Sequence, residues 1–206
     1  MEITKLKDEV QKKLENNDPA HDFEHIMRVY KIAEIIGKKE RANMKLVRAA
    51  VLLHDIISYP KSDKRSKNAS TKSALMAAKI LKKYDYNAHE IGIIVKAIGE
   101  HSFSKGMVPR TIVGKILQDA DRLDALGAIG IARTFAVGGA EKRPFYNKED
   151  PFCHKRIPED KKWTLDHFYK KLLLLEKRMN TKTGKKEAIQ RTRILKKFLN
   201  DIKKEI

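Results

Sequence analysis

The ten residues RAAVLLHDII, positions 48–57, decide the fold of this chain. From Ala49 to Leu53 the sequence is wholly apolar, which is typical of a helix that is buried on all sides. His54 and Asp55 follow at once, and no lysine or arginine occurs over 49–57. Because a carboxylate in apolar surroundings is costly unless something neutralises it, the doublet indicates a partner of opposite charge.

Helical periodicity continues on both sides of that stretch. Apolar residues recur every three or four positions over 26–36, 74–81 and 91–98, and Gly37 marks a stop for the first of these helices. The segments 111–136, 164–179 and 185–205 carry similar patterns, whereas an alternating strand pattern and an internal repeat are both missing from the sequence. The fold class predicted is all-α.

The domain organisation predicted is one domain over residues 1–206, closed by a pair of helices over 163–206. Two polar segments with prolines, 58–71 and 138–162, interrupt the helical pattern. Since long loops in compact domains are usually functional or mobile, we expect an active-site loop at the first and a lid-like loop at the second.

The composition bounds the class of protein. With 41% apolar and 35% charged residues, the chain is globular rather than disordered. Its apolar runs are far shorter than the ~20 residues of a membrane span, and its first residues lack the apolar core of a signal peptide. A cytoplasmic protein without a membrane partner is therefore expected. The single cysteine, Cys153, excludes an internal disulfide and any multi-cysteine metal site.

The formal net charge of +18 raises the question of a nucleic-acid partner. The lysines are spread along the whole chain and interleaved with acids, which favours solvated helix faces. Attraction to anionic ligands, nucleotides among them, stays open as the alternative.

A metal ion would answer the question that the doublet raises. It would neutralise Asp55, and His54 is a competent second ligand. The segment DFEHIMRV supplies His25, and QDADRLDALGA supplies Asp121 with Asp124 one turn further on. Each residue alone has an ordinary structural explanation, such as a buried histidine or a helix cap, but two histidines and two aspartates in apolar helices together indicate a metal site.

The order H…HD…D resembles the HD-domain superfamily of metal-dependent phosphohydrolases. Its motifs are similar to DFEHIMRV, AAVLLHDI and DADRLDALGAIGIAR in this sequence. Further blocks resemble the YedJ/YpgQ-like branch and cover most of the chain: PKSDKRSKNASTKSA, AIGEHSFS, EDPF, LDHFYKKLL and MNTKTGKK. The resemblance implies a single helical bundle around one metal site.

The resemblance also implies the metal ligands, which are His25, His54, Asp55 and Asp121. Oxygen and nitrogen ligands without a thiolate suit Mn²⁺, Mg²⁺, Fe²⁺, Co²⁺, Ni²⁺ or Zn²⁺, so the identity of the divalent ion stays open. The ion would lower the pKa of a bound water and hold a phosphoryl oxygen, so that hydroxide attacks phosphorus. Asp55 is on this ground expected to act in catalysis as well as in binding.

Two further residues are candidates for catalysis. His101, in EHSFS, is expected to contact a phosphate or to orient the water, with a structural role as the alternative. Asp124 is expected to hydrogen-bond the attacking water or a ligand histidine, with solvation of its helix as the alternative. Ser58 stands one helical turn after the doublet, where many relatives in other branches carry an acidic residue, so no glutamate base is assigned.

Five residues are candidates for binding substrate phosphate. Lys61 and Arg65 lie in the loop just after the doublet, where they could meet phosphate charge. Arg28 could bind substrate or pair with a nearby acid. His167 and Lys171, which match the family block LDHFYKKLL, could close over the site or serve only in core packing.

Three functions follow from these features. The first is a phosphohydrolase that cleaves a phosphoester or phosphoanhydride bond of a small nucleotide. The second is a phosphodiesterase or nuclease on oligonucleotides, which the scarcity of regularly spaced aromatic residues disfavours. The third is a non-catalytic nucleotide- or RNA-binding module, which the complete set of four ligands disfavours. The expected partner is a small phosphorylated substrate, a nucleotide, and the sequence leaves the oligomeric state open.

Overall fold

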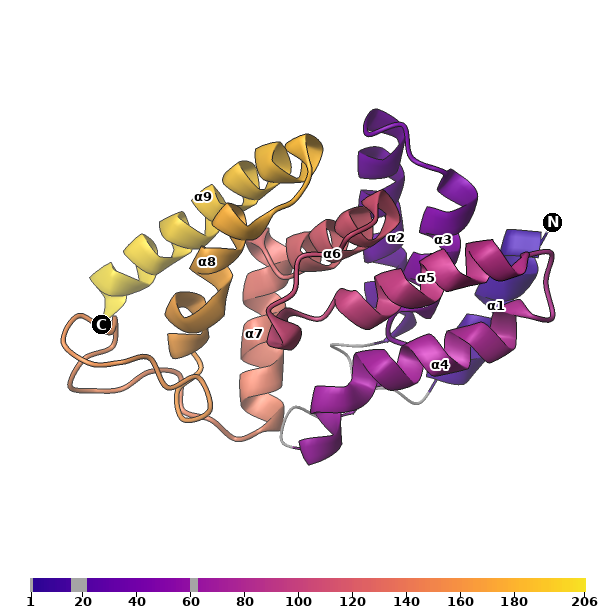
Figure 1. Ribbon diagram of the computed structural model, residues 1–206. Helices are drawn as coiled ribbons and strands as arrows, with labels where there is room; N and C mark the ends of the chain where they lie inside the picture. Colours follow the sequence, from indigo (N-terminus) through magenta and orange to yellow (C-terminus); the bar gives the residue numbers. More distant parts are fainter. Residues whose placement is uncertain (1, 16–21, 60–62) are drawn as a thin grey trace. The chain divides into compact units, whose positions relative to one another are not determined.

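The computed structural model describes residues 2–15, 22–59 and 63–206, and all regular structure among them is helical (Figure 1). The α-helices are α1 (Glu2–Leu14), α2 (Phe23–Lys39), α3 (Met44–Leu53), α4 (Ala69–Leu81), α5 (Ala88–Glu100), α6 (Ile112–Asp124), α7 (Gly127–Ala140), α8 (Leu173–Leu175) and α9 (Lys182–Glu205). The described residues also form three short 3₁₀ segments and one π-helical segment. The 3₁₀ segments are η1 (Lys64–Asn68), η2 (Phe103–Lys105) and η4 (Glu176–Arg178), and the π-helical segment is η3 (Phe168–Leu172). The predicted fold class, all-α, is confirmed.

The chain divides into two compact units, residues 1–121 and 122–206, and the boundary falls within α6. Each unit is described by itself below. Organisation as one domain over residues 1–206 stays a prediction.

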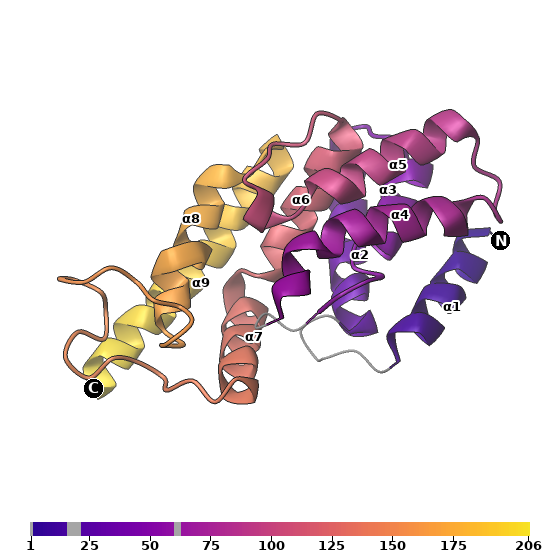
Figure 2. The ribbon, with the colours of Figure 1, turned by 60° about the horizontal axis from the view of Figure 1, so that its bottom comes forward.

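Helix α3 forms the centre of the first unit and packs against α1, α2, α4 and α5. Residues Ala49 to Leu53 are fully buried, as the wholly apolar stretch predicts. Helices α4 and α5 lie side by side along their length (Figures 1 and 2). The doublet of His54 and Asp55 follows the last residue of α3, so this buried helix delivers both side chains.

Two helix boundaries in this unit depend on side chains. Asp22 caps α2, since its carboxylate accepts a hydrogen bond from the backbone N–H of His25 at 2.8 Å. The predicted stop at Gly37 is wrong, because α2 continues to Lys39. Gly37 instead leaves room for α3, since an added Cβ would lie 2.7 Å from Sδ of Met44.

The helical pattern predicted over 74–81, which placed Leu75 on the apolar face, and the loop predicted before it both need correction. The buried stripe runs through Ser70, Ser73, Ala74, Ala77, Ile80 and Leu81, whereas Leu75 is 62% exposed. The segment predicted as a loop over 58–71 contains η1, and α4 already begins at Ala69. Asp63 starts this helical stretch, because its carboxylate accepts a hydrogen bond from the N–H of Arg65 at 2.7 Å.

The second unit has an aromatic cluster around the fully buried Phe168 of η3, with rings from α7 and α9. Phe135 packs edge-on against Phe145 and Phe198, and Phe168 stacks on Phe198 with ring centroids 5.6 Å apart. Helices α8 and α9 lie side by side in both ribbon views (Figures 1 and 2). The pattern over 164–179 predicts a continuous helix, but the backbone there is a succession of π, α and 3₁₀ turns.

The long loop of this unit is held by a buried carboxylate. It begins after Ala140 rather than at 138, because α7 runs to that residue. Both carboxylate oxygens of Asp166, which is fully buried, accept hydrogen bonds from Arg156 at 2.5 and 2.7 Å, and the N–H of Glu159 donates at 2.6 Å. The loop is therefore tied to Asp166 through Arg156 and Glu159. That it closes as a lid stays a prediction.

In the described part of the chain, no single helix has the length and apolar character needed to cross a membrane; one bent pair, α6 with α7, meets that measure only when the two are combined.

Candidate metal centre

Four helices of the first unit each bring a side chain to one cluster. His25 lies in the first turn of α2, and His54 and Asp55 follow α3. His101 follows α5 in the same way, and Asp121 lies in α6. We call these five residues the histidine–aspartate cluster.

Asp55 lies at the middle of the cluster. Its Oδ2 lies 3.7 Å from Nε2 of His54 and 3.9 Å from Nε2 of His25, and its Oδ1 lies 3.7 Å from Nε2 of His101. Nε2 of His25 also lies 3.7 Å from Oδ1 of Asp121. The structure thus brings together all four residues that the sequence predicts as ligands, and adds His101.

The protonation of two rings follows from their backbone partners. Nδ1 of His54 lies 2.8 Å from the carbonyl oxygen of Val51, and Nδ1 of His101 lies 2.7 Å from that of Ile98. Because a carbonyl oxygen only accepts, each Nδ1 must carry the hydrogen, and the neutral ring then presents a lone pair at Nε2. Nε2 of His54 is buried and has no hydrogen-bond partner among the residues that the structure describes.

This arrangement fits a divalent cation. The Nε2 lone pairs of His54 and His101 face the carboxylate of Asp55, and none of these three groups can donate a hydrogen to another while the rings are neutral. Two ligand groups of the cluster, His25 with His54 and Asp121, and His54 with Asp55 and His101, have their atoms within 4.8 Å of one another. Atoms that bind one ion at about 2.1 Å lie roughly 3–4 Å apart, as these do.

Burial and charge favour the ligand forms of the side chains. Burial lowers the pKa of His101, and neighbouring His54 lowers it further, so the imidazole is neutral at pH 7. Burial acts to raise the pKa of Asp121, but the nearby His54, His25 and His101 lower it below its ordinary value. A charged carboxylate beside neutral imidazoles is the donor set that divalent first-row metals and zinc accept.

The cluster has a buried side and an open side. The side chains of His25, His54 and His101 are at most 5% exposed, whereas those of Asp55 and Asp121 are 18% and 28% exposed. A ligand from solvent would therefore approach from the side of the two carboxylates.

The other sequence candidates near the doublet lie as follows. Lys61 falls outside the described residues. Arg65 is exposed, pairs with Asp63 at 2.7 Å and lies 4.6 Å over the ring of Tyr59. Arg28 is half-buried on α2, one turn after His25. A phosphate-binding role for any of them stays a prediction.

Three candidates belong to the second unit. The buried carboxylate of Asp124 accepts a hydrogen bond from Arg133 at 2.7 Å. Nδ1 of His167 lies 2.9 Å from Oδ2 of Asp160, and burial lowers the pKa of this histidine. Lys171 is half-buried in η3. Their catalytic and substrate-binding roles stay predictions.

The sequence indicates His101 as a catalytic candidate but does not place it among the candidate metal ligands. It was expected to touch phosphate or water, yet its Nε2 lies as close to Asp55 as that of His54 does. A signal was present, since His101 directly follows an apolar helix just as His54 follows α3.

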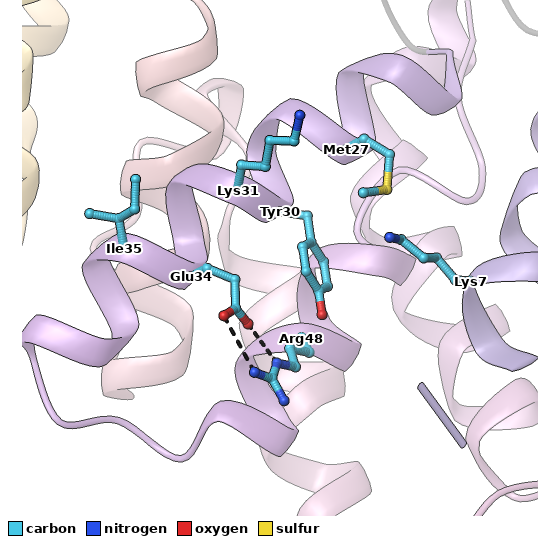
Figure 3. Close-up of a pocket in the computed structure, with 7 residues that line it drawn as sticks. All are labelled: Lys7, Met27, Tyr30, Lys31, Glu34, Ile35 and Arg48. Carbon is cyan, nitrogen blue, oxygen red and sulfur yellow. Dashed lines mark hydrogen bonds and ion pairs between the residues drawn. The ribbon is translucent and has the colours of Figure 1, made fainter. Parts of the chain in front are cut away.

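A separate hollow of about 550 Å³ lies at the surface of the first unit, and none of its lining residues belongs to the cluster (Figure 3). In it, Arg48 Nε donates to Glu34 at 2.5 Å, and Nζ of Lys7 lies 5.2 Å from the ring centroid of Tyr30. The hydrogen bond from Arg48 lowers the pKa of Glu34. The one acidic residue that lines the hollow, Glu34, is paired with Arg48, whereas the candidate metal ligands lie in the histidine–aspartate cluster.

Comparison with known proteins finds a matching family model and a similar protein. The sequence model of the HD domain family matches residues 22–126. YpgQ of Bacillus subtilis (strain 168) is 33% identical over 199 residues, which cover 96% of this chain and 90% of that protein.

Solved structures agree over nearly the whole chain. The crystal structure of Bacillus subtilis YpgQ in complex with ADP has a TM-score of 0.75 at 30% identity, covering 100% of this chain and 95% of that one. An HD-superfamily hydrolase from Bacillus thuringiensis has a TM-score of 0.75 at 37% identity, covering 98% and 95%. A protein from Lactobacillus plantarum has a TM-score of 0.78 at 30% identity, again covering 98% and 95%.

Proposed function

The chain belongs to the HD-domain family of hydrolases, and on that premise we propose that it cleaves a phosphoester or phosphoanhydride bond of a small nucleotide with the help of a divalent metal ion. One observation carries the proposal: the Nε2 atoms of His54 and His101, which present lone pairs, each lie 3.7 Å from a carboxylate oxygen of Asp55. The complex of the similar YpgQ with ADP supports a nucleotide as the ligand.

The metal would be held by His25, His54, Asp55 and Asp121, and His101 would be a further ligand through its Nε2. When bound, a divalent ion supplies Lewis acidity toward a phosphoryl oxygen and allows water to act as a nucleophile at neutral pH. Since the set lacks a thiolate, Mn²⁺, Mg²⁺, Fe²⁺, Co²⁺, Ni²⁺ and Zn²⁺ all remain candidates.

The proposed roles of the residues in the cluster differ with their exposure to solvent. The buried rings of His54 and His101 keep their Nδ1 hydrogens on backbone carbonyls, which fixes the rings and leaves Nε2 free of protons. The carboxylates of Asp55 and Asp121 face the open side, where their oxygens can accept a hydrogen bond from the attacking water. Proton acceptance from that water is the catalytic role that we propose for Asp55.

Positive charge would serve the binding of substrate phosphates. The net charge of +18 raises the local concentration of anions at low ionic strength. The side chains proposed for direct contact are Arg28, Lys61, Arg65, His167 and Lys171. We also propose a cytoplasmic location, which accords with the hydrolysis of nucleotides.

The experiment that tests this function is a substrate screen of the purified protein reconstituted with Mn²⁺. Nucleoside mono-, di- and triphosphates and a single-stranded oligonucleotide are each incubated, and the products are identified. We expect cleavage of a mononucleotide, and we expect Asp121→Ala to lower its rate roughly a hundredfold or more. Asp201→Ala, an exposed site on α9 with the same change of charge, should leave the rate unchanged.

The same variants separate the alternatives. Retention on an RNA column should depend on salt and be equal for Asp121→Ala and Asp201→Ala, because both change the charge by one unit. Preferred cleavage of the oligonucleotide would point to a phosphodiesterase. Nucleotide or RNA binding without cleavage would point to a binding module, and nucleotidase activity that survives in Asp121→Ala would exclude the cluster as its source.

A further inference from the structure

Gln118 is a fully buried amide on α6, one turn before Asp121. Its Nε2 lies 3.1 Å from the carbonyl oxygen of His101, 3.0 Å from that of Met107 and 3.4 Å from that of Glu100. Because backbone carbonyls only accept, the NH₂ end of the amide must face them. Two hydrogens thus serve three acceptors, all of them in the segment that ends α5 and follows it.

These bonds fall on backbone groups that a helix leaves unsatisfied. The last carbonyls of a helix have no partner within it, and Gln118 supplies one for Glu100 and for His101. Lys105 supplies another, since its Nζ donates to the carbonyl oxygen of Gly99 at 2.7 Å. Gln118 and Lys105 therefore both hold the end of α5, and of these two side chains it is Gln118 that bonds to the backbone of His101.

The position of His101 is fixed twice as a result. Its ring is oriented by the hydrogen bond from Nδ1 to Ile98, and its backbone carbonyl is tied to α6 by Gln118. Because Gln118 and Asp121 are three residues apart on one helix, the amide couples the place of His101 to the place of Asp121.

We propose that Gln118 is a positioning residue of the metal centre, which sets the spacing between His101 and the carboxylates that its Nε2 faces. The inference rests on the proposed metal-dependent function and names a determinant of its ion binding. Groups that orient ligands from behind typically change metal affinity 10–100-fold when they are removed. The amide does so here through a main chain rather than through a ring nitrogen.

The test compares Gln118→Met with Lys105→Met by titration with Mn²⁺ alone. Methionine keeps the length of glutamine but donates no hydrogen, so Gln118→Met frees the carbonyl of His101. Lys105→Met removes the other side chain that holds the end of α5 without touching His101. We expect Mn²⁺ to bind Gln118→Met about 10–100-fold more weakly than the wild type, and Lys105→Met within about threefold of it. The melting temperatures in chelator should fall by similar amounts in the two variants.

Equal Mn²⁺ affinities of Gln118→Met and Lys105→Met would overturn the positioning role while leaving the metal centre intact. A wild type that binds no Mn²⁺ would instead overturn the proposed function itself, so the two failures are distinguishable. If Gln118→Met does not fold, Gln118→Asn decides. It keeps the amide but draws it back by one methylene, and a loss of Mn²⁺ affinity of severalfold supports the role, whereas wild-type affinity overturns it.

Discussion

Asp55 and His101 face each other across 3.7 Å through a carboxylate oxygen and an imidazole Nε2 that both carry lone pairs. The facing atoms belong to residues that directly follow α3 and α5, and the same carboxylate lies between His54 and His25. A cation at this point would join four helices of the first unit. The metal centre is therefore expected to contribute to the stability of the fold as well as to its chemistry.

Removing the partner of the buried Asp166 carboxylate, which holds the long loop of the second unit, should lower the free energy of unfolding. Arg156→Met removes the two hydrogen bonds to the fully buried Asp166. We expect a loss of about 2–4 kcal/mol in the free energy of unfolding, below the extreme for such pairs because the side chain of Arg156 is 20% exposed. Urea-induced unfolding measures it.

The control for this prediction is the double variant Arg156→Met with Asp166→Leu. With neither charge of this pair left in place, the double variant should recover part of the lost free energy of unfolding. Lys197→Met, which breaks an exposed pair on α9, should have little measurable effect. A loss for Arg156→Met no larger than that for Lys197→Met would show that the buried pair does not hold the loop.

Two glycines in helices should respond in opposite directions to alanine. A Cβ on Gly130 in α7 would collide with the backbone carbonyl of Ala125, which cannot move aside as a side chain could. Gly130→Ala should therefore lower the free energy of unfolding by about 1–3 kcal/mol. In the described part of the chain, nothing lies within 4 Å of such a Cβ on Gly92 in α5, so Gly92→Ala should raise the free energy of unfolding by up to about 1 kcal/mol. Thermal melting of both variants checks the signs, and stabilisation by Gly130→Ala would contradict the packing at this helix junction.

The thiol of Cys153 should be unreactive in the native protein. Burial raises its pKa to about 11, with a further contribution from the charge of Asp166. Because the thiolate is the reactive form, alkylation by iodoacetamide at pH 8 should be roughly a hundredfold slower than for a free cysteine. The rate should rise about tenfold per pH unit up to pH 10, and unfolding in urea should restore the ordinary rate. Native reactivity within a fewfold of free cysteine would contradict this environment.

The sequence allowed prediction of the parts that depend on local pattern. The apolar run over 49–53 is decided by its own residues, so both the burial of α3 and the delivery of His54 and Asp55 could be predicted. His25 and Asp121 could be found because their chemistry is unusual in apolar helices. These four meet within one unit, as the resemblance to the HD-domain superfamily implies.

The features that escaped prediction depend on contacts between distant residues. His101 joins the cluster only because α5 packs against α3. Helix α2 runs past Gly37 to Lys39, and the glycine is the residue that leaves room for Met44 of α3. The order in the long loop depends on Asp166, which the sequence shows only as part of a helical pattern. Local pattern does not show these contacts. Even His101, which follows an apolar helix as His54 does, could be placed beside Asp55 only once the packing of the helices was known.

The most direct measurement of the metal centre combines Mn²⁺ stoichiometry with thermal melting for the wild type, His54→Ala and His89→Ala. His89 is an exposed histidine near the start of α5 and serves as the matched control. The wild type and His89→Ala should bind about one Mn²⁺ per chain and melt roughly 5–10 °C higher with excess Mn²⁺ than with chelator. His54→Ala should bind none and show no such difference. A wild type that binds no Mn²⁺ and melts at the same temperature with and without chelator would contradict the metal centre.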